Sequence, residues 1–84
     1  MAKYYLSPTN GRKSFYGKAY VLDDGNGGKS LYSYDTLVCV IRGGKVQLHP
    51  LWDYSTTTLT HVRAFLESNG LPAGSKAQIA KQYA

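Results

Sequence analysis

The hydrophobic pattern changes its period once along the chain, close to Pro50, and this change limits the fold more than any other feature. Before Pro50, short runs rich in β-branched and aromatic residues alternate with turn residues, which is typical of strands. After it, apolar residues recur three and four positions apart, which is typical of a helix. Strands followed by helices predict an α+β fold. The expected strands are residues 3–6, 14–22, 31–34, 36–41 and 46–48.

Two helices are predicted after the strands. The first covers about 56–69, because Ser55 is a good N-cap and Gly70 stands where a left-handed C-cap residue belongs. The second is short and covers about 76–83, where Ser75 begins the pattern of a capping box. Both helices are expected on one face of the sheet.

The strands are expected to form an antiparallel sheet of four or five members. Residues 36–41 are apolar on both parities, which predicts a strand in the middle of the sheet and covered on both faces. The glycine-centred turn at 42–45 pairs this strand with residues 46–48, and Pro50 ends the ladder because it has no N–H to donate. A chain of 84 residues has only a small core, so a single domain over residues 1–84 is expected.

The chain has one cysteine and no long apolar segment. A single cysteine excludes an intramolecular disulfide and suits a reducing compartment. No apolar run approaches the roughly 20 residues that a membrane span needs, and the first residues lack the apolar core of a signal peptide. The expectation is a cytoplasmic protein with no membrane partner.

No arrangement of residues in the sequence is typical of an enzyme. Gly28, Lys29 and Ser30 imitate the end of a phosphate-binding loop, but Asp23 occupies the position of its first glycine, and a strand follows instead of a helix. Cys39 lies in the most apolar run, so an inert core thiol is expected rather than a nucleophile. One cysteine and two histidines lack the spacing of metal ligands. The prediction is a protein without catalytic residues, cofactor or metal.

The chain is basic and rich in tyrosine. Ten Lys and Arg against five Asp and Glu give a net charge of +5, and eight residues are Tyr. Such a surface attracts nucleic acid, acidic lipid or an acidic protein face, although +5 is also an ordinary charge for a small soluble domain. Aromatic and basic side chains interleave early in the chain. This pattern predicts a binding surface made of Arg12, Lys13, Tyr16, Lys18 and Tyr20.

Three interpretations of this surface stay open. Alternate residues of a strand share a face, so Tyr16, Lys18 and Tyr20 form a platform for single-stranded nucleic acid if no bulge interrupts them at Gly17. Tyrosine clusters suit protein interfaces equally well. Tyrosines also cover a thin sheet without any further role.

The residues before the first helix add Tyr54 to the predicted binding surface. Tyr54 precedes the N-cap Ser55 and three threonines of the first turn, where an anion would meet unpaired N–H groups. The plainer interpretation is an elaborate helix start, with Trp52 and Tyr54 packed on the sheet. His61 is expected at the rim of the apolar face of the helix, one turn from Phe65.

Two stretches of the chain carry a family resemblance. They read SYDT-V at residues 33–38 and YS-TT--H---FL at residues 54–66. Together with the stretch from Leu6 to Ala19, they resemble a family of small proteins of bacterial phages and related mobile elements. The resemblance implies an accessory protein, of a kind that often acts on host machinery or host defences. It implies no catalytic or binding residue.

Two functions follow as hypotheses. In the first, the protein is not an enzyme and binds a protein complex of a bacterial host, inhibiting or modulating it; a defence nuclease of the CRISPR type would be one such target. The alternative is a basic, tyrosine-rich module that binds nucleic acid. A homodimer formed through an unpaired sheet edge is compatible with both hypotheses.

Overall fold

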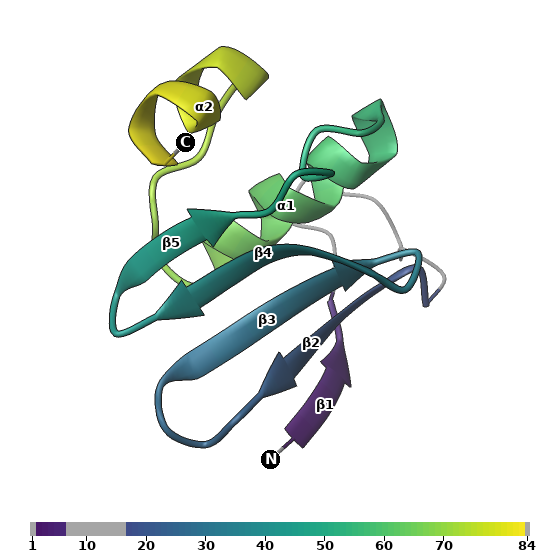
Figure 1. The fold of residues 1–84 in the computed structure, drawn as a ribbon, viewed down its shortest axis with the longest axis vertical. Coiled ribbons are helices and arrows are strands. Elements are labelled where there is room, and N and C mark those ends of the chain that lie inside the picture. Colours follow the sequence, from purple (N-terminus) through teal and green to yellow (C-terminus); the bar gives the residue numbers. More distant parts are fainter. Residues whose placement is uncertain (1, 7–16, 84) are drawn as a thin grey trace.

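The computed structural model describes residues 2–6 and 17–83, and it confirms the α+β fold. Five strands come first and two helices follow, as Figure 1 shows. Both helices lie where the capping residues predict them. The elements are β1 (Ala2–Tyr5), β2 (Ala19–Asp23), β3 (Gly28–Ser33), β4 (Thr36–Arg42), β5 (Lys45–Leu48), α1 (Thr56–Ser68) and α2 (Lys76–Tyr83).

The sheet is an antiparallel meander with the order β1-β2-β3-β4-β5. The apolar run of β4 is an inner strand, as predicted, but the middle strand is β3. Leu37 and Val40 of β4 stay half-buried, because they lie on the face of the sheet that carries no helix. The prediction that this strand is covered on both faces was therefore wrong.

Tight turns with left-handed backbone join β3 to β4 and β4 to β5. Gly43 and Gly44 adopt φ values of 58° and 80°, which suits a two-residue hairpin. Tyr34 and Asp35 make the other turn with φ values of 51° and 64°. A tyrosine in this region of backbone space is uncommon. The turn leaves the Tyr34 side chain 52% exposed at the end of the sheet.

The second strand is shorter than the pattern predicts. A strand over residues 14–22 is expected, whereas β2 begins at Ala19. Gly17 lies in a turn with a φ of 75°, which favours glycine, and does not form a bulge inside a strand. Residues 14–16 lie outside the described part of the chain.

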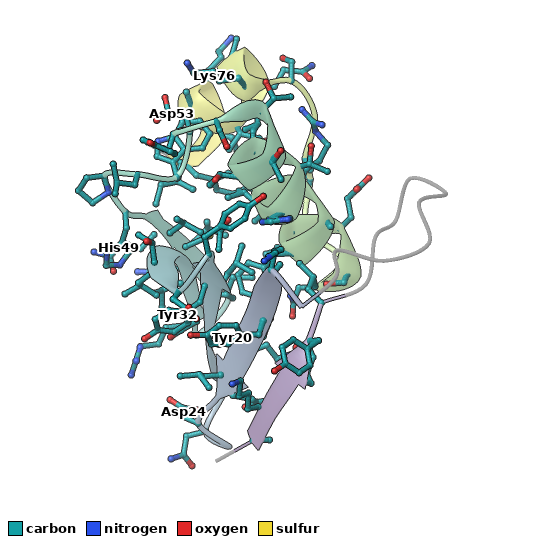
Figure 2. The ribbon with its side chains drawn as sticks, turned by 90° about the vertical axis from the view of Figure 1, so that its right-hand side faces the viewer. Tyr20, Asp24, Tyr32, His49, Asp53 and Lys76 are labelled. Carbon is teal, nitrogen blue, oxygen red and sulfur yellow. The ribbon has the colours of Figure 1, made fainter. Side chains whose placement is uncertain are left out.

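The core lies between one face of the sheet and the two helices. α1 contacts β3 and α2 contacts β5, and the side view in Figure 2 places α1 against one face of the strands. The largest fully buried side chains include Leu31 of β3 and Phe65 and Leu66 of α1. Below, this face is called the covered face and the opposite one the open face.

Candidate functional site

A pocket lies at the end of the covered face, where the β3–β4 turn meets the segment before α1. Its volume is about 350 Å³. It is lined by Ser33, Tyr34, Thr36, Val38, Leu51, Tyr54 and Thr58, and it is called the Tyr54 pocket below. These residues come from the two stretches on which the family resemblance rests, together with Leu51. Segments about twenty residues apart in sequence therefore build one site.

Three large apolar side chains at this pocket face solvent. Tyr54 is 77% exposed, Tyr34 is 52% exposed and Leu51 is 48% exposed. Among the described residues, the other exposed large apolar side chains are Tyr4 and Tyr5 of β1, at 40% and 61%. Exposed aromatic side chains around one hollow are typical of a binding surface.

The segment before α1 is held in place by a hydrogen bond, an ion pair and the packing of Trp52. Trp52 is 9% exposed and belongs to the core, and its backbone N–H donates to the carbonyl oxygen of His49 at 3.0 Å. The Lys76 Nζ of α2 lies 3.3 Å from the Asp53 Oδ2, and both residues are labelled at the same end of the molecule in Figure 2. Trp52 packs into the core as expected, whereas the expected packing of Tyr54 on the sheet was wrong, because Tyr54 and Leu51 stay at the surface.

The floor of the Tyr54 pocket is formed by the buried hydroxyl groups of Ser33 and Thr58, which belong to a chain of hydrogen-bonded hydroxyls that ends at an imidazole. The Ser33 Oγ lies 2.7 Å from the His61 Nδ1 and 3.3 Å from the Thr58 Oγ1. The Ser55 Oγ, which accepts from the backbone N–H of Thr58 at 3.1 Å, lies 3.2 Å from the Thr58 Oγ1. These bonds join β3 to α1 directly beneath the pocket.

The prediction that His61 lies at the rim of the helix face was wrong. The side chain is 1% exposed, and the Tyr34 ring lies over it with ring centroids 5.8 Å apart. His61 stands three positions after Thr58 and four before Phe65, so the three share one helix face. That spacing identifies a buried face, but only the structure shows that Ser33 supplies its polar partner.

The open face carries a row of three tyrosines, which is called the tyrosine row below. Tyr5, Tyr20 and Tyr32 are directly opposite one another on β1, β2 and β3. The Tyr20 and Tyr32 rings are stacked with centroids 5.1 Å apart and planes 4° apart, and both are labelled close together in Figure 2. The Tyr5 ring meets Tyr20 edge-on at 6.3 Å. The Lys3 Nζ lies 4.4 Å from the Tyr20 ring centroid and 5.5 Å from that of Tyr5.

Tyr20 is the most constrained member of the tyrosine row. Desolvation by its neighbours, followed by the hydrogen bond that its hydroxyl donates to the Asp35 carboxylate, raises the pKa of this phenol above its usual value. Lys3 and Tyr32 lie against its ring. Tyr20 is therefore the central ring that contacts the other two tyrosines, whereas Tyr5, at 61% exposure, is the ring accessible to a ligand.

The structure separates the residues of the predicted binding surface. Tyr54 lines the pocket at the covered face, Tyr20 lies in the tyrosine row on the open face, and Lys18 is exposed just before β2. Tyr20 and Tyr54 thus belong to two different surfaces. Arg12, Lys13 and Tyr16 lie outside the described residues.

Several residues of both surfaces escaped the sequence reasoning. Lys3, Tyr5 and Tyr32 join Tyr20 only once the strand register is known. Tyr34 and Leu51 join Tyr54 only once the pocket is known. The doubled tyrosine at residues 4–5 and the tyrosine in a two-residue turn were the available signals.

Two further observations concern catalytic chemistry. Cys39 is buried, as its place in the apolar run predicts, and burial raises the pKa of its thiol to about 12. Within residues 2–6 and 17–83, no three His, Cys, Asp or Glu side chains gather where they could hold a metal ion.

Neither α1 nor α2 is long and apolar enough to cross a membrane.

In the described part of the chain, the fold is a small α+β domain in which a five-stranded meander carries two helices on one face and none on the other. The chain belongs to the family of unknown function DUF8033, whose model matches residues 4–81. No curated protein and no solved structure matches the chain.

Proposed function

We propose that this protein acts without catalysis, by binding a protein complex of a bacterial host and inhibiting or modulating it. The observation that carries the proposal is the Tyr54 pocket, where Tyr34, Leu51 and Tyr54 stand exposed around a hollow of about 350 Å³. Energetically important interface residues are enriched in tyrosine and cluster around pockets that lose their water on binding. A side chain of the partner inserted between the three would remove their apolar surface from water.

The pocket suits a protein partner better than a small molecule. Its three apolar side chains project at the surface instead of enclosing a ligand, and Tyr54 is 77% exposed. Small-molecule sites usually enclose most of the ligand. The buried hydroxyls beneath are already bonded to one another and to His61, so the floor is rigid. A rigid floor with an exposed aromatic rim is a preorganised site for an anchor residue.

The resemblance to phage and mobile-element proteins supplies the partner class within this proposal. Accessory proteins of that kind often act on host defences, and a nuclease complex of the CRISPR type is the target we propose to examine first. One sheet with two helices offers enough surface for a standard interface of roughly 800 Å² per side.

Affinity capture with matched variants tests the proposal. The immobilised protein is incubated with a nuclease-treated bacterial lysate, and retained proteins are quantified by mass spectrometry. Wild type and Tyr4→Ala should retain the same complex in equal amounts. Tyr54→Ala should reduce the amount of retained complex by about tenfold or more, the loss expected for an interface hot spot. Tyr4 is the matched control because it is an exposed tyrosine outside the pocket. Equal retention by all three proteins, or no retained protein, contradicts the proposal.

A further inference from the structure

The open face of the sheet is the largest feature that the pocket does not explain. None of the described helices lies on it, and Leu22, Tyr32, Leu37 and Val40 remain half-buried there. Sheets that are left open on one face usually turn simple polar side chains to water. Here the strands present a row of aromatic rings instead.

The charge of the open face is predominantly positive. Lys3 lies on it at β1, Arg42 and Lys45 lie together at the β4–β5 turn, and Lys18 is exposed beside β2. Two acids that contact residues of this face already have partners.

Those two acids are Asp24 and Asp35. The Asp24 Oδ1 accepts from the backbone N–H groups of Asn26 at 2.7 Å and Gly28 at 3.0 Å, and these bonds lower the pKa of the carboxyl. Its other oxygen lies 3.9 Å from an Arg42 nitrogen. Asp35 accepts from the Tyr20 hydroxyl. The exposed lysines are therefore the groups free to meet a polyanion.

Lys3 and Tyr5 combine these two properties at one point. The Lys3 Nζ is held over the Tyr20 and Tyr5 rings at 4.4 and 5.5 Å from their centroids. Tyr5 is 61% exposed, so part of its ring is accessible. A fixed cation beside an exposed ring matches one nucleotide, whose phosphate is anionic and whose base has a flat π-face.

We propose that the open face binds single-stranded nucleic acid, with a base against the Tyr5 ring and phosphates beside Lys3 and its neighbouring cations. The positive charge complements the phosphate backbone of any nucleic acid. The exposed ring selects a single strand, because bases inside a duplex are already stacked on each other. This site is separate from the Tyr54 pocket and does not depend on the function proposed for it.

Fluorescence anisotropy with a labelled oligonucleotide of about 15 nucleotides tests the proposal. The purified protein is titrated into single-stranded DNA, single-stranded RNA and a DNA duplex at low and at moderate salt. A single strand should bind more tightly than the duplex, and the affinity should fall steeply as salt rises. Lys3→Gln should weaken binding and reduce the salt dependence by about one phosphate contact.

Two tyrosine variants separate stacking from charge. Tyr5→Leu should weaken binding on the order of fivefold or more, the loss expected for one stacked base, whereas Tyr5→Phe keeps the ring and should bind like wild type. Lys81→Gln, an exposed lysine of α2, is the charge control for Lys3→Gln. Circular dichroism of each variant verifies that the overall fold is retained.

Three outcomes would overturn the proposal. They are the absence of binding at low salt, tighter binding of the duplex, and losses in Lys81→Gln as large as in Lys3→Gln. Tyr54→Ala should leave oligonucleotide binding unchanged, so the two surfaces are judged separately.

Discussion

The two faces of the sheet differ in how far their side chains are buried, as neighbouring residues of β3 show. Leu31 lies on the covered face and is fully buried, whereas Tyr32 lies on the open face and is half-buried. The covered face also holds Ser33, a hydroxyl that needs a buried partner and finds it in His61. The open face holds aromatic rings that cover part of one another's apolar surface through their mutual contacts. Stability should therefore depend mainly on the covered face, and the binding of nucleic acid on the open one.

The largest expected effect comes from Leu31→Ala against Tyr32→Ala. Leu31→Ala removes a fully buried side chain and should lower the free energy of unfolding by about 2–5 kcal/mol. Tyr32→Ala removes cross-strand contacts on the open face and should cost about 1 kcal/mol or less. Urea unfolding at pH 7 measures both. Equal losses would show that the open face is covered in solution, for instance by a second copy of the chain.

The next effect concerns the hydroxyl chain beneath the pocket. Ser33→Ala removes a hydrogen bond from the buried His61 Nδ1 and should cost about 1–3 kcal/mol, because a buried polar atom then lacks that partner. Ser30→Ala, on the open face of the same strand, is the control and should change stability by at most about 0.5 kcal/mol. If urea unfolding gives the same midpoint for both variants, the Ser33–His61 bond does not stabilise the contact between sheet and helix.

A pH effect follows from Cys39 on the covered face. Burial raises its pKa from 9.0 to about 12, so above pH 9 the unfolded chain releases this proton and the folded chain does not. Stability should therefore fall as pH rises above 9, by about 1 kcal/mol at pH 10. Unfolding curves at pH 8 and pH 10 measure the difference. Cys39→Ala should show a smaller fall, and an identical fall would assign the effect to other groups.

The smallest effect is expected for Tyr20→Phe on the open face. The variant keeps the stacked ring and loses only the hydroxyl that donates to Asp35. Its stability at pH 7 should match that of the Ser30→Ala control. Because the pKa of Tyr20 is raised, absorbance titration of the tyrosines at high pH should lose one late-titrating phenol, while Tyr83, whose pKa burial also raises, still titrates late. Loss of an early-titrating phenol instead would contradict the raised pKa of Tyr20.

Local signals were enough to predict most of the fold. The bounds of both helices follow from Ser55, Gly70 and Ser75, because capping chemistry acts over three or four residues. The β4–β5 hairpin follows from its glycine pair for the same reason. What these elements share is that the deciding contact lies within one turn of the chain.

Contacts between distant segments could not be predicted in the same way. The alignment of Tyr5, Tyr20 and Tyr32 depends on strand register, and a shift of one residue would move a side chain to the other face. The partner of His61 is 28 residues away on another element. Both surfaces proposed to bind are built from such contacts, which explains why the site was less accessible from sequence than the fold.

The order of the strands also has a consequence for how fast the chain folds. Each strand pairs only with strands adjacent in the sequence, so no strand pairing requires contact between elements far apart along the chain. Short loop closures carry a small entropic cost, and topologies of this kind fold quickly for their size. We therefore expect the hairpins to form before α1 docks and the bond between Ser33 and His61 to close late. Weakening that late bond should accelerate unfolding and leave the folding rate almost unchanged.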